Sequence, residues 1–182
     1  ISPERVFLPM KNPLPYLSLP HAYFADLELL AHKLPKHLAA HTFRKEIGKL
    51  TSFRGNIVEC LSPEPLLRRA MMIYSYFGHA WVWEDPEAPK DFIPYQIAVP
   101  WFAIAKKLDR HPILSYASYA LDNWQRLDVD APIELGNIAL FQNFLGGMDE
   151  EWFILVHVDI EAKAGSALAG ILEAYEAVFN ND

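Results

Sequence analysis

Cysteine is nearly absent from this sequence, which holds Cys60 alone among 182 residues. A single cysteine cannot form an internal disulfide, so the chain does not belong to the disulfide-stapled secreted class. The opening residues, Ile1-Ser2-Pro3-Glu4-Arg5, also lack the basic and apolar segments of a signal peptide. We therefore expect a reducing, cytoplasmic setting.

Long apolar runs and an excess of positive charge are lacking as well. No uninterrupted apolar run reaches the ~18–20 residues that a membrane span needs. The chain has 16 Lys and Arg against 23 Asp and Glu, for a net charge of −7. A nucleic-acid partner needs a basic face to meet its phosphates. We therefore expect no membrane span and no nucleic-acid partner.

Apolar residues are abundant, and their spacing is mainly helical. Hydrophobic residues make up 52% and aromatic residues 13% of the sequence, enough for the core of one large domain. The periodicity predicts an all-α, multi-helical fold. The proline-dense residues 1–20 predict an extended arm. Predicted helices cover residues 22–33, 35–50, 66–83, 101–108, 113–127, 136–144 and 149–179, with Pro35 and Pro100 at helix starts.

The last predicted helix holds an unusual histidine. Asp149 is a suitable N-cap, and the acids after it suit the positive end of the helix dipole. On a helical wheel one stripe contains Phe153, His157, Ile160, Ala164 and Ala167. From the residues alone, His157 is either a core histidine with a hydrogen-bond partner or a pocket residue that faces a cofactor or substrate.

Other histidines give weaker signals. His37 and His41 are four apart on a predicted helix and can reach one metal, but no acidic residue completes a zinc-protease pattern. A polar helix face is the predicted role for both. His79 is predicted to pack in the core or at its rim. The loop 84–94 is either a lid or a surface connection.

Seven short stretches, taken together in order and spacing, resemble the indoleamine 2,3-dioxygenase family. They are Phe7-Leu8-Pro9, Asn12-Pro13-Leu14, Phe92-Ile93-Pro94, Ile97-Ala98-Val99-Pro100-Trp101, Pro112-Ile113-Leu114-Ser115-Tyr116-Ala117, Leu121-Asp122-Asn123-Trp124 and Phe153-Ile154-Leu155-Val156-His157-Val158-Asp159-Ile160-Glu161. The resemblance covers the N-terminal half of such an enzyme. It implies a small helical domain over residues 1–145 and, after the Gly146-Gly147 joint, the start of a large haem-binding domain over residues 146–182.

The resemblance also assigns site residues. Tyr116, Tyr119, Ala120, Phe153 and His157 match positions that line the distal haem pocket of the family. Phe153 matches the aromatic residue that packs on the indole ring. His157 matches a serine of the mammalian branch and a histidine of the tryptophan 2,3-dioxygenases, which accepts a hydrogen bond from the indole N–H. Tyr119 replaces a smaller residue of the mammalian branch, which leaves pocket shape and substrate open.

The implied activity is haem-dependent dioxygenation of tryptophan or a related indole, which opens the C2–C3 bond to give N-formylkynurenine. Iron protoporphyrin IX is the implied cofactor, dioxygen the second substrate, and His157 the catalytic residue that accepts or relays the indole proton. The family's proximal haem histidine and its carboxylate-binding arginine lie in the C-terminal half. No metal ligand is therefore expected in this chain, and that half, as a second chain or segment, is the expected partner.

Three alternatives remain at this stage. The first is a haem enzyme of the same superfamily with different indole chemistry. The second is a non-catalytic helical module that binds haem or another ligand. The third is a plain helical interaction domain in which His157 belongs to the core.

Overall fold

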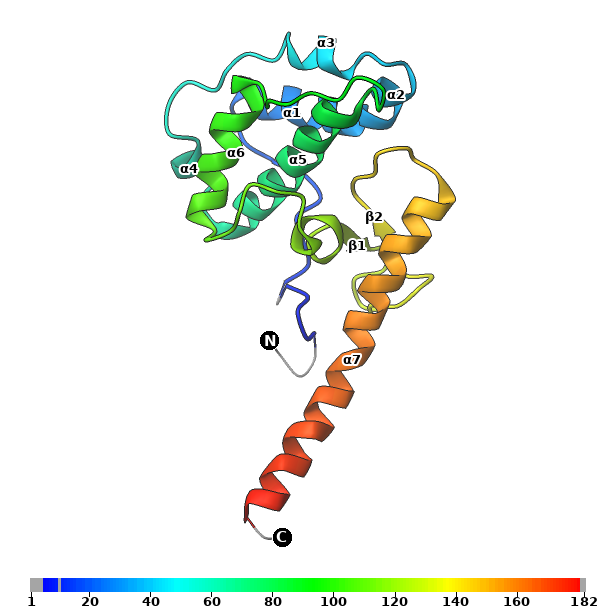
Figure 1. Ribbon diagram of the computed structural model, residues 1–182. Helices are drawn as coiled ribbons and strands as arrows, with labels where there is room; N and C mark the ends of the chain where they lie inside the picture. Colours follow the sequence, from blue (N-terminus) through cyan, green and yellow to red (C-terminus); the bar gives the residue numbers. More distant parts are fainter. Residues whose placement is uncertain (1–4, 10, 181–182) are drawn as a thin grey trace.

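The computed structural model describes residues 5–9 and 11–180 and shows a helical body from which one long helix extends (Figure 1). The predicted helical fold is confirmed, with the addition of a short two-stranded sheet in this part of the chain. The elements are α1 (Ala22–His32), α2 (Leu34–Ala39), α3 (Phe43–Ile47), α4 (Ile57–Cys60), α5 (Glu64–Trp83), α6 (Tyr95–Lys107), the π-helix η1 (Ala117–Leu121), β1 (Trp124–Arg126), β2 (Ile138–Leu140) and α7 (Met148–Asn180).

Helix α5 is the centre of the body. Its apolar residues lie nearly all round the helix, which predicts burial, and most of its length is buried between α1, α3, α6 and η1. Gly78 allows α6 to come close, because a Cβ atom at this position would lie 2.7 Å from Cη2 of Trp101. The main core therefore forms around α5 and fixes the position of η1.

Two predicted helices differ from the structure in their bounds. The predicted helix over 35–50 is wrong as one element, because the chain turns between α2 and α3, where His41 has φ of 49°. The predicted helix start at Pro100 is also wrong. Helix α6 begins at Tyr95 and Pro100 lies inside it, at a cost of one backbone hydrogen bond that the packing of α6 on α5 offsets.

The predicted helices over 113–127 and 136–144 are wrong. Only Ala117–Leu121 is helical in the first, and a strand follows it at Trp124. The second contains β2, which pairs antiparallel with β1 so that Trp124 faces Leu140 and Arg126 faces Ile138. Trp124 is fully buried there, next to Leu155 and Val158 of α7. This hairpin is the surface on which the first turns of α7 pack.

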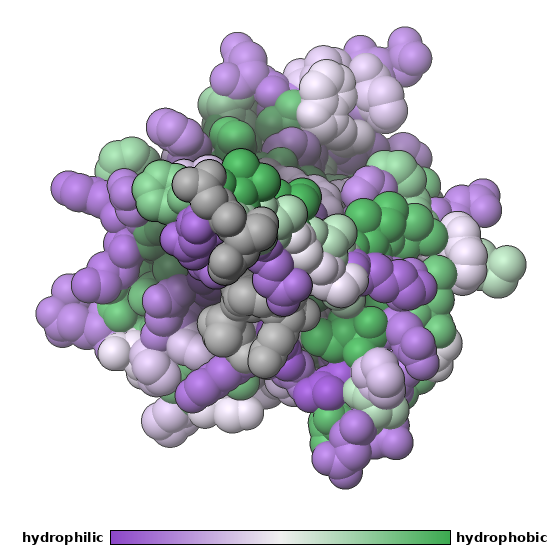
Figure 2. Space-filling model, turned by 90° about the horizontal axis from the view of Figure 1, so that it is seen from below, coloured by the Kyte–Doolittle hydropathy of each residue, from purple (hydrophilic) through white to green (hydrophobic). Residues whose placement is uncertain are grey.

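Helix α7 packs only along its first half. Ile154, Leu155 and Val158 form the buried face against β2 and η1. Beyond Gly165 the helix leaves the body, and its side chains there are mostly exposed (Figure 1). Figure 2 views the molecule from this end and shows hydrophobic residues exposed among hydrophilic ones. The predicted N-cap is displaced, because α7 begins at Met148 and Asp149 lies in its first turn.

The N-terminal arm is held at two buried leucines. Leu8 packs with Trp124, and Leu17 packs in the main core. Glu28 of α1 accepts a hydrogen bond from the backbone N–H of Leu17 at 2.8 Å. The predicted arm over 1–20 is confirmed where it is described, since no helix or extended ladder occurs there, while residues 1–4 and 10 lie outside the described part. No helix of the described ranges is long and apolar enough to cross a membrane.

Candidate functional site

Four of the residues that the sequence singled out come together where η1 meets the first turns of α7. Tyr116 precedes η1 and Tyr119 lies within it, while Phe153 and His157 are one turn apart on α7. A π-helix widens the turn by one residue, and such turns occur often at functional sites. The sequence predicts a regular helix here, so the π-turn is a feature that it did not reveal.

The four rings form a continuous row. The Tyr116 and His157 ring centres lie 5.9 Å apart, those of His157 and Phe153 4.7 Å, and those of Phe153 and Tyr119 6.4 Å. Phe153 is 56% exposed and Tyr116 43% exposed, whereas Tyr119 and His157 are partly buried. We call these four side chains the aromatic wall. Its exposed ring faces can pack against a flat ligand.

His157 has a defined hydrogen bond within the wall. Its Nδ1 atom lies 2.7 Å from the backbone carbonyl oxygen of Phe153. A carbonyl oxygen only accepts, so Nδ1 carries the proton in this arrangement. In the neutral imidazole, Nε2 is then left with a lone pair that can accept a hydrogen bond from a ligand. In the described part of the chain the His157 side chain is only partly buried, which favours the pocket alternative over the core alternative, and its role stays a prediction.

Tyr116 is held by a carboxylate from the facing helix. Its hydroxyl donates a 3.1 Å hydrogen bond to Oε1 of Glu161, one turn after His157 on α7. Burial, and then the hydrogen bond to Glu161 and its negative charge, raise the pKa of Tyr116 to about 12. Tyr116 therefore remains a neutral donor across the physiological range.

Tyr119 is supported from behind by Tyr76 of α5. The rings of Tyr76 and Tyr119 stack with their centres 6.1 Å apart. The ring of Phe144 packs on that of Tyr76, with their centres 4.5 Å apart. Burial raises the pKa of Tyr119, and the nearby charge of Glu150 raises it further. Tyr119 thus presents its ring to Phe153 as a neutral phenol.

Asn123 fixes the end of η1 from within the core. Its Nδ2 atom lies 2.9 Å from the hydroxyl of Tyr76, 2.8 Å from the carbonyl oxygen of Gln142 and 3.1 Å from that of Tyr119. Its Oδ1 accepts from the backbone N–H of Gln142 at 2.9 Å. This fully buried amide therefore ties η1, α5 and the segment after β2 to one another.

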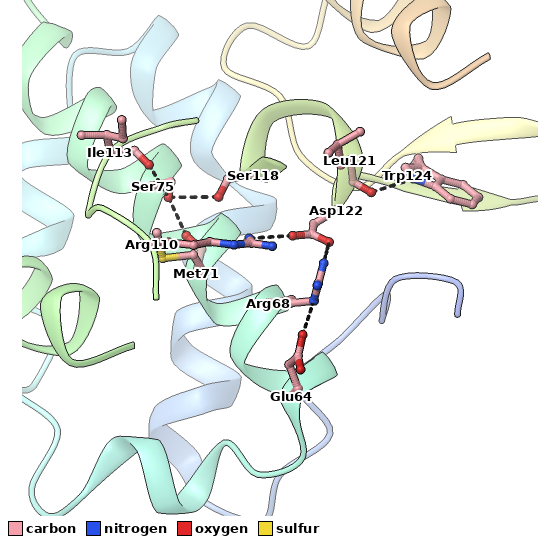
Figure 3. A network of polar contacts seen from close by, with 10 residues as sticks. All are labelled: Glu64, Arg68, Met71, Ser75, Arg110, Ile113, Ser118, Leu121, Asp122 and Trp124. Atoms are coloured by element: carbon pink, nitrogen blue, oxygen red, sulfur yellow. Dashed lines mark hydrogen bonds and ion pairs between the residues drawn. The ribbon is translucent and has the colours of Figure 1, made fainter. Parts of the chain in front are cut away.

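Asp122, the residue before Asn123, anchors the same turn to two arginines. Its carboxylate accepts hydrogen bonds of 3.0 Å from Arg68 of α5 and from Arg110 after α6 (Figure 3). Arg68 also pairs with Glu64 at 2.8 Å. The Asp122 side chain is 2% exposed, and the two guanidinium groups compensate its buried charge.

The remaining predicted residues have different surroundings. Ala120 is 1% exposed and lies behind the wall, so its assignment to a pocket stays a prediction. His37 lies in α2 and His41 in the turn after it, and Nδ1 of His37 is 3.0 Å from Oγ1 of Thr42. His79 is partly buried at the core rim, and burial lowers its pKa. In the described ranges no three His, Cys, Asp or Glu side chains are grouped as metal ligands.

Sequence reasoning missed three residues that shape the wall: Glu161, Tyr76 and Asn123. Glu161 lies at i+4 from His157, a spacing that places both on one helix face and was available as a signal. The contacts of Tyr76 and Asn123 join segments 47 residues apart, and no local pattern indicates them. Glu150 was read only as part of an acidic cap. Its two carboxylate oxygens accept hydrogen bonds of 2.8 and 2.9 Å from the backbone N–H groups of Phe144 and Leu145.

Comparison with known proteins adds an independent line of support. The sequence profile described as "Indoleamine 2,3-dioxygenase" matches residues 1–182. The chain is 33% identical to indoleamine 2,3-dioxygenase 1 of Rattus norvegicus, over 93% of this chain and 41% of the relative. It is 30% identical to indoleamine 2,3-dioxygenase acdA of Aspergillus candidus, over 97% of this chain and 44% of the relative. It is 29% identical to indoleamine 2,3-dioxygenase 2 of Homo sapiens, over 88% of this chain and 39% of the relative. The chain thus spans less than half the length of these relatives.

Proposed function

We propose a function from the premise that the chain belongs to the indoleamine 2,3-dioxygenase family. The chain is the N-terminal part of a haem-dependent dioxygenase that opens the indole ring of tryptophan or a related indole. The aromatic wall forms the distal side of its substrate pocket. One observation carries this assignment: Phe153 and Tyr116 expose their rings on either side of His157, whose Nδ1–H is already bonded to a backbone carbonyl.

The chemistry of the wall suits an indole that lies on top of a flat cofactor. Aromatic side chains that are exposed together in one contiguous patch mark ligand or partner surfaces. Phe153 and Tyr116 supply such surface, and their tilted rings suit offset or edge-to-face contact with an indole. Nε2 of His157 supplies one polar acceptor among them. A few polar groups within an apolar lining are typical of small-molecule pockets.

The residues of this chain have separate roles in the proposed reaction. Phe153 and Tyr116 hold the plane of the indole and keep water from it. Nε2 of His157 accepts the hydrogen bond of the indole N–H and takes or relays its proton. Glu161 keeps the Tyr116 hydroxyl occupied, so that this ring stays in one orientation. When bound, haem supplies the iron that activates dioxygen for insertion into the C2–C3 bond.

In this proposal the residues of this chain line only one face of the haem. The wall, which includes Tyr119 of η1, offers apolar and aromatic surface for the distal face of a porphyrin, and Ala120 lies behind it. No residue of the wall serves as the axial ligand in this proposal. We assign the proximal histidine, and the arginine that binds the substrate carboxylate, to the part of the family's length beyond residues 1–182. In this division residues 1–145 are the small domain and residues 146–182 begin the haem domain.

The test uses the full-length protein that carries this chain, expressed with added haem precursor. We expect a Soret band, a spectral change on addition of tryptophan, and N-formylkynurenine when a reductant and dioxygen are supplied. Absence of a Soret band would contradict every haem-dependent reading. A Soret band and indole binding without any oxidised product would instead support a non-catalytic ligand-binding module.

Tyr119 favours one second candidate, a related enzyme with different indole chemistry. Its ring centre lies 6.4 Å from that of Phe153, at a position where the family resemblance implies a smaller side chain in the mammalian branch. Product analysis with tryptophan and with ring-substituted indoles separates the two candidates. N-formylkynurenine from tryptophan supports the first, and turnover of another indole alone supports the second.

A further inference from the structure

A second cavity lies under the N-terminal arm, apart from the aromatic wall. It has a volume of about 390 Å³, within the range of small-molecule sites. The arm crosses it between its two buried anchors, Leu8 and Leu17, and α5 forms its floor. The apolar part of its lining consists of Pro9, Pro13, Leu14 and Pro65.

The polar part of this cavity is dominated by cations. Lys11, Arg68 and Arg69 line it together with the carboxylates of Glu64 and Asp122. Both carboxylates are already bound by Arg68, at 2.8 and 3.0 Å (Figure 3). Asp122 is bound by Arg110 as well. Both carboxylates in the lining are therefore in use, and among the lining cations Arg68 and Arg69 are paired with carboxylates while Lys11 adds a further positive charge.

Arg69 has one donor group without a hydrogen-bond partner in the part of the chain that the structure describes. Its side chain is 6% exposed, and its Nε and Nη2 atoms donate to Glu28 at 3.0 and 2.7 Å. Its Cζ atom lies 5.1 Å from the centre of the Phe141 ring. The third nitrogen, Nη1, is buried and has no hydrogen-bond partner. Buried polar groups in native proteins nearly always have a partner, and Arg69 lines the cavity, so an acceptor bound there can supply the missing one.

We propose that the cavity between the N-terminal arm and α5 binds a small organic carboxylate. The carboxylate meets the Nη1 donor of Arg69 and the charge of Lys11, and its apolar body packs against the prolines and Leu14. Arginine recognises carboxylates well because its planar donors match their geometry. The site is separate from the aromatic wall, since none of the wall residues lines it.

The arm is tied to the same ion pair, which gives the site a defined shape. Oε1 of Glu28 accepts from both Arg69 and the backbone N–H of Leu17. One carboxylate therefore joins the arm, α1 and α5 at the edge of the cavity. A ligand carboxylate on Nη1 would add a partner to Arg69 without displacing Glu28, because Glu28 uses the other edge of the guanidinium group.

The experiment titrates the full-length protein with benzoate, and with benzyl alcohol as the neutral counterpart, by ligand-observed NMR. We expect saturable benzoate binding at millimolar or lower concentration and at least about tenfold weaker binding of benzyl alcohol. Arg69→Lys keeps the charge, replaces the two-point contact with Glu28 by a single ammonium and removes Nη1, and it should weaken benzoate binding at least about tenfold. Leu14→Trp fills the cavity without touching the ion pair and should abolish binding.

Two controls separate this cavity from others. Leu145→Trp places the same bulk in a cavity of about 520 Å³ next to His79, and His157→Ala alters the aromatic wall. Both variants should bind benzoate as the parent protein does. The proposal is overturned by any of four results: no saturable binding up to about 20 mM, equal binding of the alcohol, unchanged binding in Leu14→Trp, or loss of binding in His157→Ala. Should Arg69→Lys fail to fold, Leu14→Trp and the two controls still decide the question.

Discussion

The Nδ1 atom of His157 and the carbonyl oxygen of Phe153 lie 2.7 Å apart, one turn along α7. This contact sets the tautomer of the imidazole and places its free nitrogen in the aromatic wall. The orientation of the group that would receive the indole proton is therefore built into a helix, before any substrate is bound. Rigid elements hold functional groups more precisely than loops do.

Replacement of His157 tests its role as acceptor. His157→Ala should lower kcat/KM for tryptophan roughly 10- to 100-fold, because loss of one hydrogen bond to a buried substrate N–H costs about 1–3 kcal/mol. The Soret band should persist. His32→Ala, an exposed histidine of α1, is the matched control and should change neither. Parent-like kinetics for His157→Ala would remove the proposed role of this residue.

Tyr116 makes the stability of the folded state depend on pH in the alkaline range. Its pKa is raised to about 12, first by burial and then by Glu161, so the folded state holds this proton more tightly than the unfolded chain does. The contribution to stability is complete below the unfolded pKa of about 10 and is lost as the pH rises from about 10 to about 12. Urea unfolding across this window should show a smaller decline in Tyr116→Phe than in the parent protein. An identical decline in both would show that Tyr116 does not titrate as described.

The buried pair of Glu28 and Arg69 should dominate the stability of the arm and α1. Glu28→Ala leaves an uncompensated guanidinium group and should lower the free energy of unfolding by about 3–5 kcal/mol. The double variant Glu28→Leu with Arg69→Met should lose much less, because neither charge remains buried. Urea denaturation measures both. Lys49→Ala, which removes an exposed ion pair with Glu46, is the control and should leave the midpoint unchanged. A double variant as unstable as Glu28→Ala would contradict this account.

Two glycines of long helices should respond in opposite directions to alanine. Gly78→Ala forces a methyl group against Trp101 and should destabilise the protein by about 1–3 kcal/mol, despite the better helix propensity of alanine. Gly170→Ala, on the exposed part of α7 with no atom within 4 Å of a new Cβ, should stabilise helix α7 by up to about 1 kcal/mol. Thermal and urea unfolding monitored by circular dichroism compare the two. The close approach of α5 and α6 would be in question if Gly78→Ala were as stable as the parent protein.

The sequence predicted the long helices well, because their signals are local. Helix α5 and helix α7 have long apolar stretches with few breaks, and both occur within a few residues of the predicted bounds. The hairpin was missed for the opposite reason. Trp124 and Leu140 pair across 16 positions, and short apolar runs fit a helix or a strand equally well until the partner is known.

The candidate site was predictable in part. The spacing of Phe153 and His157 on one helix face follows from the sequence, and family resemblance supplied Tyr116 and Tyr119. The conformation that brings these residues together did not follow, because the π-turn of η1 depends on Asn123 and Asp122, whose partners lie on α5, after α6 and after β2. Such long-range polar contacts carry no local signal.

Glu150 accepts hydrogen bonds from both N–H groups of the turn before α7 and so fixes the start of this helix. Helix α7 has 33 residues, which corresponds to a length of about 50 Å. The first half of α7 is packed on β2 and η1, so a bend of the free part falls beyond Gly165. A bend of about 5° there would move the far end, about 22 Å away, by about 2 Å, and would leave Phe153 and His157 in place.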